Sequence, residues 1–287
     1  VTDVKARNDR LKIELQMYDT VDFHLNIFVK EIIVKNLEGR DREIRLFFNH
    51  DFHIYENKVG DTAYYDPDTR AIIHYKSQRY FLINCCDPTK CGVDHFATGI
   101  KELRGAEGTW RDAEDGTLSG NPIAQGSVDS TLGINLQIKA YGENVAHYWI
   151  AAGMKHSDVV TLNKVIWEKT PEELIRRTEN YWKMWVNKEV FNFYDLPQRL
   201  VSFFKRSLLI IRTQIDNNGA IIAANDSDIV QMGSDTYSYM WPRDGALVAY
   251  AMIKSGYMEI TKRFFQFCAD VISKDGYLLH KYNPDRS

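Results

Sequence analysis

Residues 11–34 read LKIELQMYDTVDFHLNIFVKEIIV, and this stretch decides the fold class. Apolar residues recur in it at every second position, namely Leu11, Ile13, Leu15, Met17, then Phe23, Leu25, Ile27, Val29, then Ile32 and Val34. A period of two is typical of antiparallel strands with one buried face. Because the strand over residues 11–17 has no obvious partner upstream, we also expect strands to be missing at this edge.

The same pattern continues beyond this stretch, and turn residues interrupt it at regular intervals. Leu37-Glu38-Gly39-Arg40 precedes an apolar strand at 44–48, and Asp66-Pro67-Asp68-Thr69 separates strands at 63–65 and 71–75. Both interruptions are typical of hairpins. Further strands are predicted at 134–138 and 148–150. The sequence therefore predicts a large antiparallel β domain over residues 1–165.

The period changes after residue 165. Thr170-Pro171-Glu172-Glu173 carries a capping threonine, a proline at the first helical position and an early glutamate, which together predict a helix start. A second helix is expected from Asp195-Leu196-Pro197-Gln198, and others at about 244–254 and 258–273. We expect a helical linker over residues 166–194 and a helical domain over 195–287. Strands followed by helices indicate a multidomain α+β chain.

Composition excludes several classes of protein. The 287 residues carry a formal net charge of -3, which offers no polybasic surface for nucleic acid or anionic lipid. The longest apolar runs, such as residues 245–253, fall short of the roughly 20 residues of a membrane-spanning helix. We therefore expect a soluble protein that binds neither nucleic acid nor membrane. The first residues show neither an apolar leader nor a starting methionine, so we expect the sequence to begin inside a longer one.

The chain has four cysteines, which is sparse for its length. They are Cys85, Cys86, Cys91 and Cys268. This usage fits a reducing, cytoplasmic location better than a disulfide framework. A metal site at Cys85-Cys86-x4-Cys91 is disfavoured because no second ligand pair follows at a standard spacing. We expect these cysteines to be ordinary buried or surface thiols.

The segment between the helices expected at 195–215 and 244–254 is the most unusual. It combines Tyr237, Trp241, a proline and the adjacent pair Arg243-Asp244. A sugar pocket needs aromatic faces for the CH face of a pyranose, with polar groups for its hydroxyls. Arg243 can donate to hydroxyls there and Asp244 can accept from them.

A structural role competes with the sugar-binding one. Asp244 can cap the following helix and Arg243 can pair with a neighbouring carboxylate, while Trp241 and Tyr237 can belong to the core. From the residues alone, this structural explanation is favoured.

The element Tyr237-x-x-x-Trp241-Pro242-Arg243-Asp244-Gly245, placed in a helical domain behind a β domain and linker, resembles glycoside hydrolase family 15. That family contains glucoamylases, glucodextranases and related trehalases. The resemblance covers the whole chain, including residues 51–55, 61–66 and 277–282.

The resemblance implies an antiparallel β supersandwich, a helical linker and the first helices of an (α/α)6 toroid that binds the non-reducing end of an α-glucan or maltooligosaccharide. Arg243 and Asp244 look like the pair that hydrogen-bonds the terminal glucose. Trp241 resembles an aromatic wall of the subsite, and Tyr237 resembles the tyrosine beside the scissile oxygen. No metal or other cofactor is implied.

Catalysis in this family inverts the anomeric centre with one glutamic acid and one glutamate. The resemblance places both in later loops of the toroid, beyond Ser287. We therefore expect the chain alone to be an inactive part of an exo-acting O-glycosyl hydrolase of polysaccharide degradation. Its oligomeric state and linkage preference do not follow from the sequence.

Other candidate groups lack a context that singles them out. The carboxylates considered as substitutes for the missing glutamates are Glu56, Asp61, Asp226, Asp228 and Asp235. Solvated loop acids are the commoner case. His53, His74 and His280 lie near aromatic residues and are expected to be structural. The match of Asn225-Asp226-Ser227 to a glycosylation acceptor is expected to be accidental.

Three alternatives remain open. A trehalase of the same family differs only in linkage. A disaccharide phosphorylase shares the sandwich and toroid but uses phosphate in place of the water-activating base. A non-catalytic carbohydrate-binding or regulatory protein, like the glucoamylase-like regions of phosphorylase kinase regulatory subunits, would keep the pocket without the two glutamates.

Overall fold

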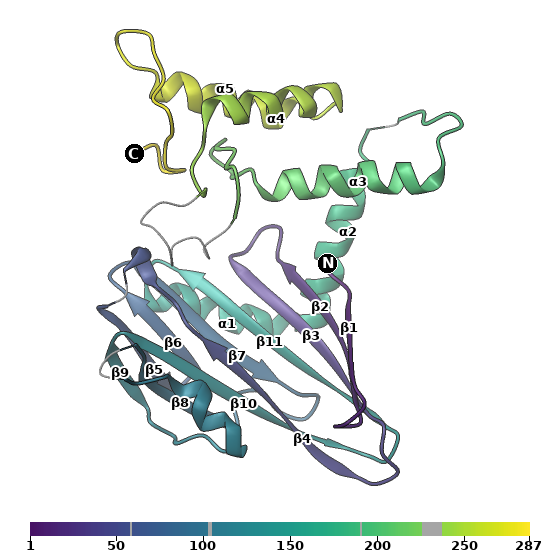
Figure 1. The fold of residues 1–287 in the computed structure, drawn as a ribbon, viewed down its shortest axis with the longest axis vertical. Coiled ribbons are helices and arrows are strands. Elements are labelled where there is room, and N and C mark those ends of the chain that lie inside the picture. Colours follow the sequence, from purple (N-terminus) through teal and green to yellow (C-terminus); the bar gives the residue numbers. More distant parts are fainter. Residues whose placement is uncertain (58, 103–104, 190, 226–236) are drawn as a thin grey trace. The chain divides into compact units, whose positions relative to one another are not determined.

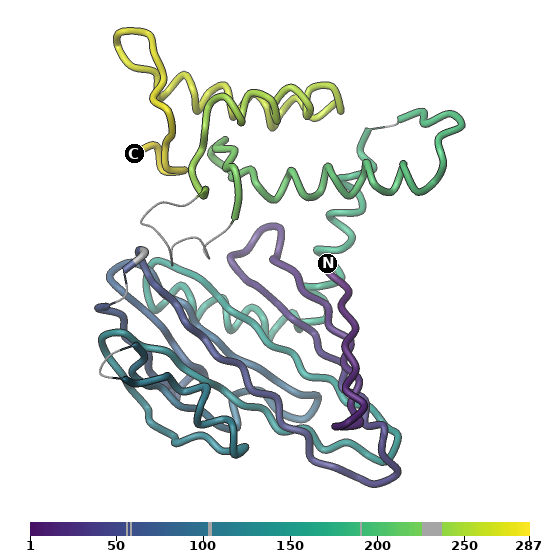
Figure 2. Tube along the Cα trace, in the orientation of Figure 1, coloured from purple at the N-terminus to yellow at the C-terminus, as the bar shows by residue number. Residues whose placement is uncertain are grey.

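The computed structural model describes residues 1–57, 59–102, 105–189, 191–225 and 237–287. The chain divides into two compact units, Val1–Tyr181 and Trp182–Ser287. The chain path within each unit can be followed in Figures 1 and 2. No helix among the described residues is both long and apolar enough to cross a membrane.

The first unit contains two antiparallel sheets (Figure 1). The larger has eight strands in the order β1 (Val4–Asn8), β2 (Ile13–Val21), β3 (Ile27–Asn36), β11 (Glu143–Gly153), β7 (Arg79–Cys86), β6 (Ala71–Lys76), β5 (Asp61–Asp66) and β9 (Ile123–Gly126). The smaller has the order β4 (Arg42–His50), β10 (Val128–Ile138) and β8 (His95–Ile100). Two 3-10 turns, η1 (Ile54–Glu56) and η2 (Thr109–Asp115), complete the described elements of this unit before its helices.

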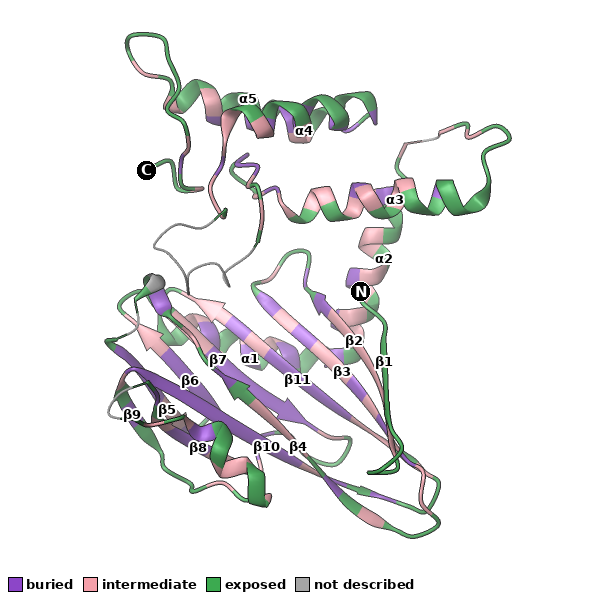
Figure 3. Ribbon diagram, viewed as in Figure 1, coloured by how far each residue is buried: buried purple, intermediate pink, exposed green. Residues whose placement is uncertain are grey.

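The main core lies between the two sheets, as one sandwich. Ile134 and Leu136 of β10 face Ile32 and Val34 of β3 across it, all fully or almost fully buried. Figure 3 shows β10 buried along most of its length. Burial of this kind contributes roughly 25 cal/mol for each Å² of apolar surface removed from water, so the sandwich core is the main stabilising feature of the first unit.

Strand β3 explains the change of phase in the apolar pattern. Ile27 and Val29 pack on one face of the large sheet with Trp149, whereas Ile32 and Val34 pack on the other face, inside the sandwich. The apolar positions shift from odd to even residue numbers within β3, and such a one-residue shift moves the side chains to the opposite face of the sheet. The first half of the strand is therefore buried on one face and the second half on the other.

Helix α1 (His156–Lys169) covers the outer face of the large sheet. The sequence pattern predicted strands to about residue 165, and this was wrong, since β11 ends at Gly153 and a helix begins three residues later. The β-branched residues of α1 favour strands locally, but packing of Val159 and Ile166 on the sheet stabilises the helix. Gly153 is required here because a Cβ would lie 2.7 Å from Cβ of Asp158.

The predicted strands are confirmed, and the hairpin expected at residues 66–69 joins β5 and β6. The hairpin expected at residues 37–40 was wrong, because β3 pairs with β2 and β11 in the large sheet while β4 pairs with β10 in the small one. Further revisions concern strands that were not predicted, among them β1 and β7. The strand expected at 11–17 is β2, and β1 pairs with it in the register Val4↔Met17, so it does have a partner upstream. Strand β7 was not predicted. It is buried on both faces over its last five residues and so lacks the alternation that marks a half-buried strand.

The predicted helices are also confirmed. They are α2 (Pro171–Val186), α3 (Gln198–Thr213), α4 (Pro242–Lys254) and α5 (Met258–Val271). Thr170 acts as predicted, because its hydroxyl accepts a hydrogen bond from the backbone N–H of Glu173 at 3.4 Å. In the second unit, Leu208 of α3 packs with Met252 of α4, and α4 packs on α5 through Ala249 and Phe264. The chain is thus a mixed α+β protein with large antiparallel sheets and several helices.

A polar network lies buried within the sandwich. His50 contacts the Ser130 hydroxyl at 3.2 Å through Nδ1 and the Tyr148 hydroxyl at 2.8 Å through Nε2. His74 Nε2 lies 2.7 Å from the same serine oxygen. Burial lowers the pKa of both imidazoles from the ordinary value of 6.5 to about 3. The expected structural role of His74 is confirmed, and both rings are neutral in the folded protein at pH 7.

Acidification is expected to destabilise the first unit through these two histidines. The unfolded chain takes up their protons near pH 6.5, whereas the folded chain takes them up only near pH 3. The stabilisation is therefore complete above pH 6.5 and falls by about 1.4 kcal/mol per pH unit for each histidine as the pH drops towards 3. Urea unfolding between pH 7 and pH 5 measures this slope. His74→Gln should flatten it and the exposed His156→Gln should not, so an equal slope in both variants contradicts the assignment.

Candidate functional site

Three segments far apart in the sequence form a small β arrangement in the second unit. Met240 forms isolated antiparallel bridges with Ile222 on one side and Tyr282 on the other. Its backbone N–H donates to the Tyr282 carbonyl at 2.9 Å, and the Tyr282 N–H returns a bond of the same length. Met240 is fully buried, so this arrangement is anchored in the core. It brings the flanking residues of all three segments close together.

Trp241 follows Met240 and occupies the N-cap position of α4. The ring of His280 meets it edge to face, with centroids 4.8 Å apart and planes at 82°. Nζ of Lys281 lies 5.7 Å from the centroid of Trp241 and 4.0 Å from that of Tyr239. The indole Nε1 is buried and has no hydrogen-bond partner among the described residues. A buried N–H without a partner is costly, so this donor is suited to an external acceptor.

Arg243 and Asp244 lie in the first turn of α4. Arg243 Nη2 donates to Asp244 Oδ2 at 3.1 Å, and their side chains are 76% and 45% exposed. The N-cap residue of α4 is Trp241, whose side chain forms no capping hydrogen bond within the described part of the chain. The capping role considered for Asp244 is therefore wrong, because Asp244 lies three residues after the N-cap residue and its carboxylate pairs with Arg243. Nor is Tyr237 a core residue, since it is 52% exposed.

A hollow of about 320 Å³ lies beside Asp244. Its lining is mostly apolar and comes from the end of α3, the segment after it and the start of α4, namely Ile211, Gln214, Ile221, Ile222, Ala223, Asp244, Gly245, Leu247 and Val248. Oε1 of Gln214 is buried without a hydrogen-bond partner among the described residues. The hollow thus combines apolar walls with an amide and a carboxylate, which is the usual composition of a small-molecule site.

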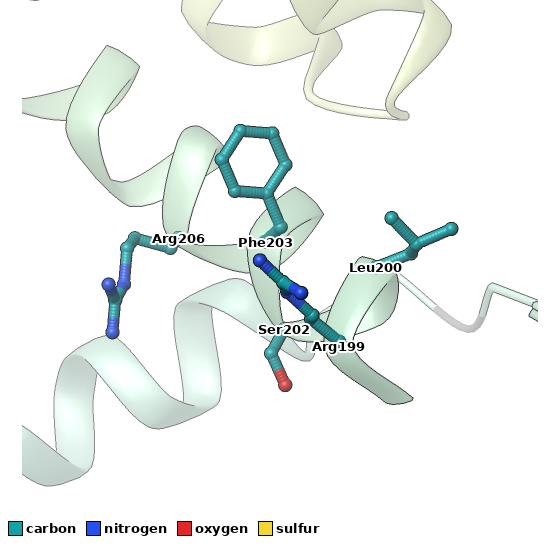
Figure 4. A pocket seen from close by; sticks show the side chains of 5 residues that line it. All are labelled: Arg199, Leu200, Ser202, Phe203 and Arg206. Atoms are coloured by element: carbon teal, nitrogen blue, oxygen red, sulfur yellow. The ribbon is translucent and has the colours of Figure 1, made fainter. Parts of the chain in front are cut away.

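A second hollow, of about 610 Å³, lies along the first turns of α3 (Figure 4). Arg199, Leu200, Ser202, Phe203 and Arg206 line it, and all five belong to one helix. Phe203 is 68% exposed, so this is an open helix surface. None of the residues expected to bind sugar lines it.

The structure thus gathers Trp241, Arg243 and Asp244 at the start of α4. Tyr237 lies on the same segment, where its carbonyl accepts a hydrogen bond from the backbone N–H of Ala224 at 3.2 Å. Sequence reasoning missed Gln214 and Lys281, and it treated His280 as structural. Gln214 has no local signal in the sequence, and the signal for His280 and Lys281 is their proximity to aromatic residues. The bridge between Met240 and Tyr282, which positions His280 and Lys281, is not local.

The remaining candidates either lie outside the described residues or have partners in the first unit. Asp226, Asp228, Asp235 and the Asp226-Ser227 part of the glycosylation match lie outside the described residues, as does the side chain of Glu56. Asp61 is buried in the first unit, where it pairs with Lys76 at 3.1 Å and accepts a hydrogen bond from the backbone of Ile54. His53 lies 3.1 Å from the ammonium of Lys101. These contacts indicate structural roles.

The chain is related in sequence to a protein of known class. It is 26% identical over 281 residues to an uncharacterized glycosyl hydrolase of Methanocaldococcus jannaschii. The alignment covers 94% of this chain but 43% of that protein, so the chain spans less than half the length of its relative. No model of a known protein family matches the chain.

The fold of the chain is similar to part of a glucoamylase. A bacterial glucoamylase complexed with acarbose superposes with a TM-score of 0.71 over 97% of this chain and 41% of that structure, at 16% identity. A putative kojibiose phosphorylase from the human microbiome matches 62% of this chain and 22% of its own, at 10% identity and a TM-score of 0.38, which is too low to support an argument. The chain is therefore glycoside hydrolase-like in sequence and glucoamylase-like in fold.

Proposed function

We propose that the chain is part of an exo-acting, inverting α-glucan hydrolase similar to the glucoamylases of glycoside hydrolase family 15. In this proposal residues 1–165 form the β supersandwich domain, residues 166–194 the linker, and residues 195–287 the start of an (α/α)6 toroid. The observation that carries the proposal is the superposition of 97% of the chain on a bacterial glucoamylase. The sequence relationship to a glycosyl hydrolase supports it independently.

The chemistry at the start of α4 also supports the proposal. A pyranose can stack its CH face on Trp241, while Arg243 donates to its hydroxyls and Asp244 accepts from them. We assign Tyr237 to the neighbourhood of the scissile oxygen. Because the glucoamylase of known structure was bound to acarbose, we propose that an oligosaccharide of this kind binds here too.

These four residues would bind and position the substrate, which is how they would contribute to rate. Proton transfer is assigned to two glutamates that lie outside this chain in the whole protein. One would protonate the leaving oxygen and the other would activate water on the opposite face of the sugar. The chain alone is accordingly proposed to be inactive.

Exposed apolar side chains on the helices of the second unit support the proposed toroid. Figure 3 shows exposed residues on α3, α4 and α5, interspersed with intermediate and buried ones. Large apolar side chains at least 41% exposed on these helices include Leu200, Phe203, Ile210, Leu247, Tyr250, Ile253, Met258 and Phe265. Apolar surface of this extent usually has a partner, and further helices of the same toroid are the partners proposed here.

The test is an assay of the full-length protein on maltotriose, isomaltose and trehalose, each with and without inorganic phosphate. The proposal predicts phosphate-independent release of glucose from maltotriose, and inhibition of that release by acarbose. Release from trehalose alone indicates the trehalase alternative, and glucose 1-phosphate that forms only with phosphate indicates a phosphorylase. Sugar binding without turnover indicates the non-catalytic alternative.

Arg243→Lys is expected to lower kcat/KM of the full-length enzyme about tenfold. An ammonium group cannot present the planar fork of donors that a guanidinium offers to adjacent hydroxyls and to Asp244 at once. Kinetics on maltotriose measure the effect. Arg176→Lys is the matched control, because Arg176 also pairs with a nearby carboxylate on its own helix, at Glu173, but lies outside the site. Equal kinetics of the two variants would remove Arg243 from the sugar site.

A further inference from the structure

Cys86 and Cys91 form a facing pair in the first unit, at the end of β7. The chain leaves β7 at Cys86, turns through residues 87–90 and returns at Cys91 as an isolated antiparallel bridge partner. The N–H of Asp87 donates to the Lys90 carbonyl at 2.9 Å, and the N–H of Gly92 donates to the Cys85 carbonyl at 2.8 Å. These bonds flank the pair on both sides, so the two cysteines occupy a non-hydrogen-bonded position.

This position suits a disulfide bond. Directly opposed residues of this type have Cα atoms about 4.5 Å apart and side chains on the same face. Disulfides in proteins span Cα separations from about 4.4 to 6.8 Å. Cys86 and Cys91 are directly opposed bridge partners of this kind. Oxidation therefore needs little movement of the backbone.

The two sulfur atoms are suited to different roles. Cys91 is exposed, whereas Cys86 is buried. The neighbouring thiol of Cys86 lowers the pKa of Cys91 to about 7, and His147 contributes less in the same direction. Partial burial and the carboxylates of Asp87 and Glu172 oppose this shift. The pKa of Cys86 is raised by the neighbouring thiol of Cys91 and by burial. Cys91 is thus the accessible nucleophile, and Cys86 is the thiol within reach to resolve it.

The other two cysteines provide internal controls. Cys85 is fully buried in the sandwich core, and burial raises the pKa of its thiol. Burial also raises the pKa of Cys268, which lies on α5 in the second unit. Neither has the lowered pKa and exposure that make a thiol reactive.

We propose that Cys86 and Cys91 are a redox modification site, at which a hydroperoxide converts the two thiols into a reversible disulfide. The Cys91 thiolate attacks the outer oxygen of the hydroperoxide, which breaks the O–O bond and releases an alcohol, or water from hydrogen peroxide, after proton uptake. The Cys86 sulfur then attacks the resulting sulfenic acid and expels hydroxide, which takes the Cys86 proton and leaves as water. One hydroperoxide is reduced and two thiols are oxidised. A small dithiol reverses the reaction.

The bond would join Cys86, the last residue of β7, to Cys91, the first residue after the turn. Cys86 is also paired with His147 of β11, whose imidazole lies 3.1 Å from Glu31 and 3.5 Å from Glu172 in the first turn of α2. The modification site therefore adjoins a charged cluster that links the sheet to the start of α2. This inference does not depend on the proposed function.

The test treats the full-length protein with hydrogen peroxide, alkylates the remaining thiols and digests it with trypsin. Cleavage after Lys90 places the two cysteines on separate peptides, residues 80–90 and 91–101. The proposal predicts that these peptides become joined, with a mass 2 Da below the sum of the free peptides before alkylation. Fragmentation should place the bond on Cys86 and the alkyl group on Cys85. Dithiothreitol should separate the peptides again.

Matched variants keep the test decisive. Cys268→Ser should form the joined peptides as the unaltered protein does, and the exposed Cys91→Ser should abolish them. Cys86→Ser should leave Cys91 to stop at sulfenic acid or to react with an added thiol. A bond mapped to Cys85, or fully alkylated Cys86 and Cys91 after peroxide treatment, would overturn the proposal.

Discussion

Asp244→Ala in the full-length protein is expected to lower kcat/KM on maltotriose by about 100-fold. Loss of hydrogen bonds to a charged group costs up to about 3 kcal/mol, and each 1.4 kcal/mol corresponds to a factor of ten. The fold should be nearly unchanged. Asp244 is half exposed, and Trp241 rather than Asp244 is the N-cap residue of α4. The described side-chain contact of Asp244 is an exposed pair with Arg243, which contributes little to stability.

Steady-state kinetics and thermal unfolding together test this expectation. Glu259→Ala is the matched control, because Glu259 is also an acidic residue in the first turn of a helix and also pairs with a basic neighbour, Lys262. It should leave both kinetics and unfolding temperature within error. Unchanged kinetics of Asp244→Ala would remove Asp244 from the sugar site, and a large loss of stability would return it to a structural role.

Gly245→Ala is expected to destabilise the second unit by about 2 kcal/mol. A Cβ at this position would lie 2.4 Å from Cε2 and 2.8 Å from Cζ of Phe264, whose ring is almost fully buried between α4 and α5. Overpacking lowers the free energy of unfolding by up to about 3 kcal/mol, whereas the higher helix propensity of alanine raises it by roughly 1 kcal/mol. The clash is the larger effect, so the variant should be less stable. The last residue of the Trp-Pro-Arg-Asp-Gly element thus serves packing.

Urea unfolding followed by a signal from the second unit measures this change. Phe264→Leu in the Gly245→Ala background should recover part of the stability, because the smaller side chain makes room for the new methyl group. The informative quantity is the difference between the stability change of the double variant and the sum of the two single changes. Additive losses, or a single variant as stable as the unaltered protein, would contradict close packing of the two helices at Gly245.

Local sequence patterns predicted most of the elements, and the exceptions have physical reasons. The alternation over residues 11–34 is typical of half-buried strands and led to β2 and β3. Strand β7 is buried on both faces and so shows no alternation. Helix α1 carries strand-favouring residues and is helical because it packs on the sheet. For both β7 and α1, packing against residues far away in the sequence outweighed the local pattern.

The sequence predicted the residues of the candidate site that lie close together in the chain, but not those that come from later segments. The residues Trp241, Arg243 and Asp244 are adjacent in sequence and could be found as one motif. His280 and Lys281 lie some 40 residues later and reach Trp241 only because Tyr282 pairs with Met240. The capping role weighed for Asp244 also could not be judged from sequence, since it depends on which residue takes the N-cap position, and Trp241 takes it.

The most direct test of the proposed hydrolase is the anomeric form of the first glucose that the full-length protein releases from maltotriose. Proton NMR in the first minutes of the reaction distinguishes the two anomers before they equilibrate. An inverting glucoamylase-like enzyme must release β-glucose first, and Asp244→Ala must slow that release. α-Glucose as the first product, or no cleavage of any α-glucoside, would contradict the account.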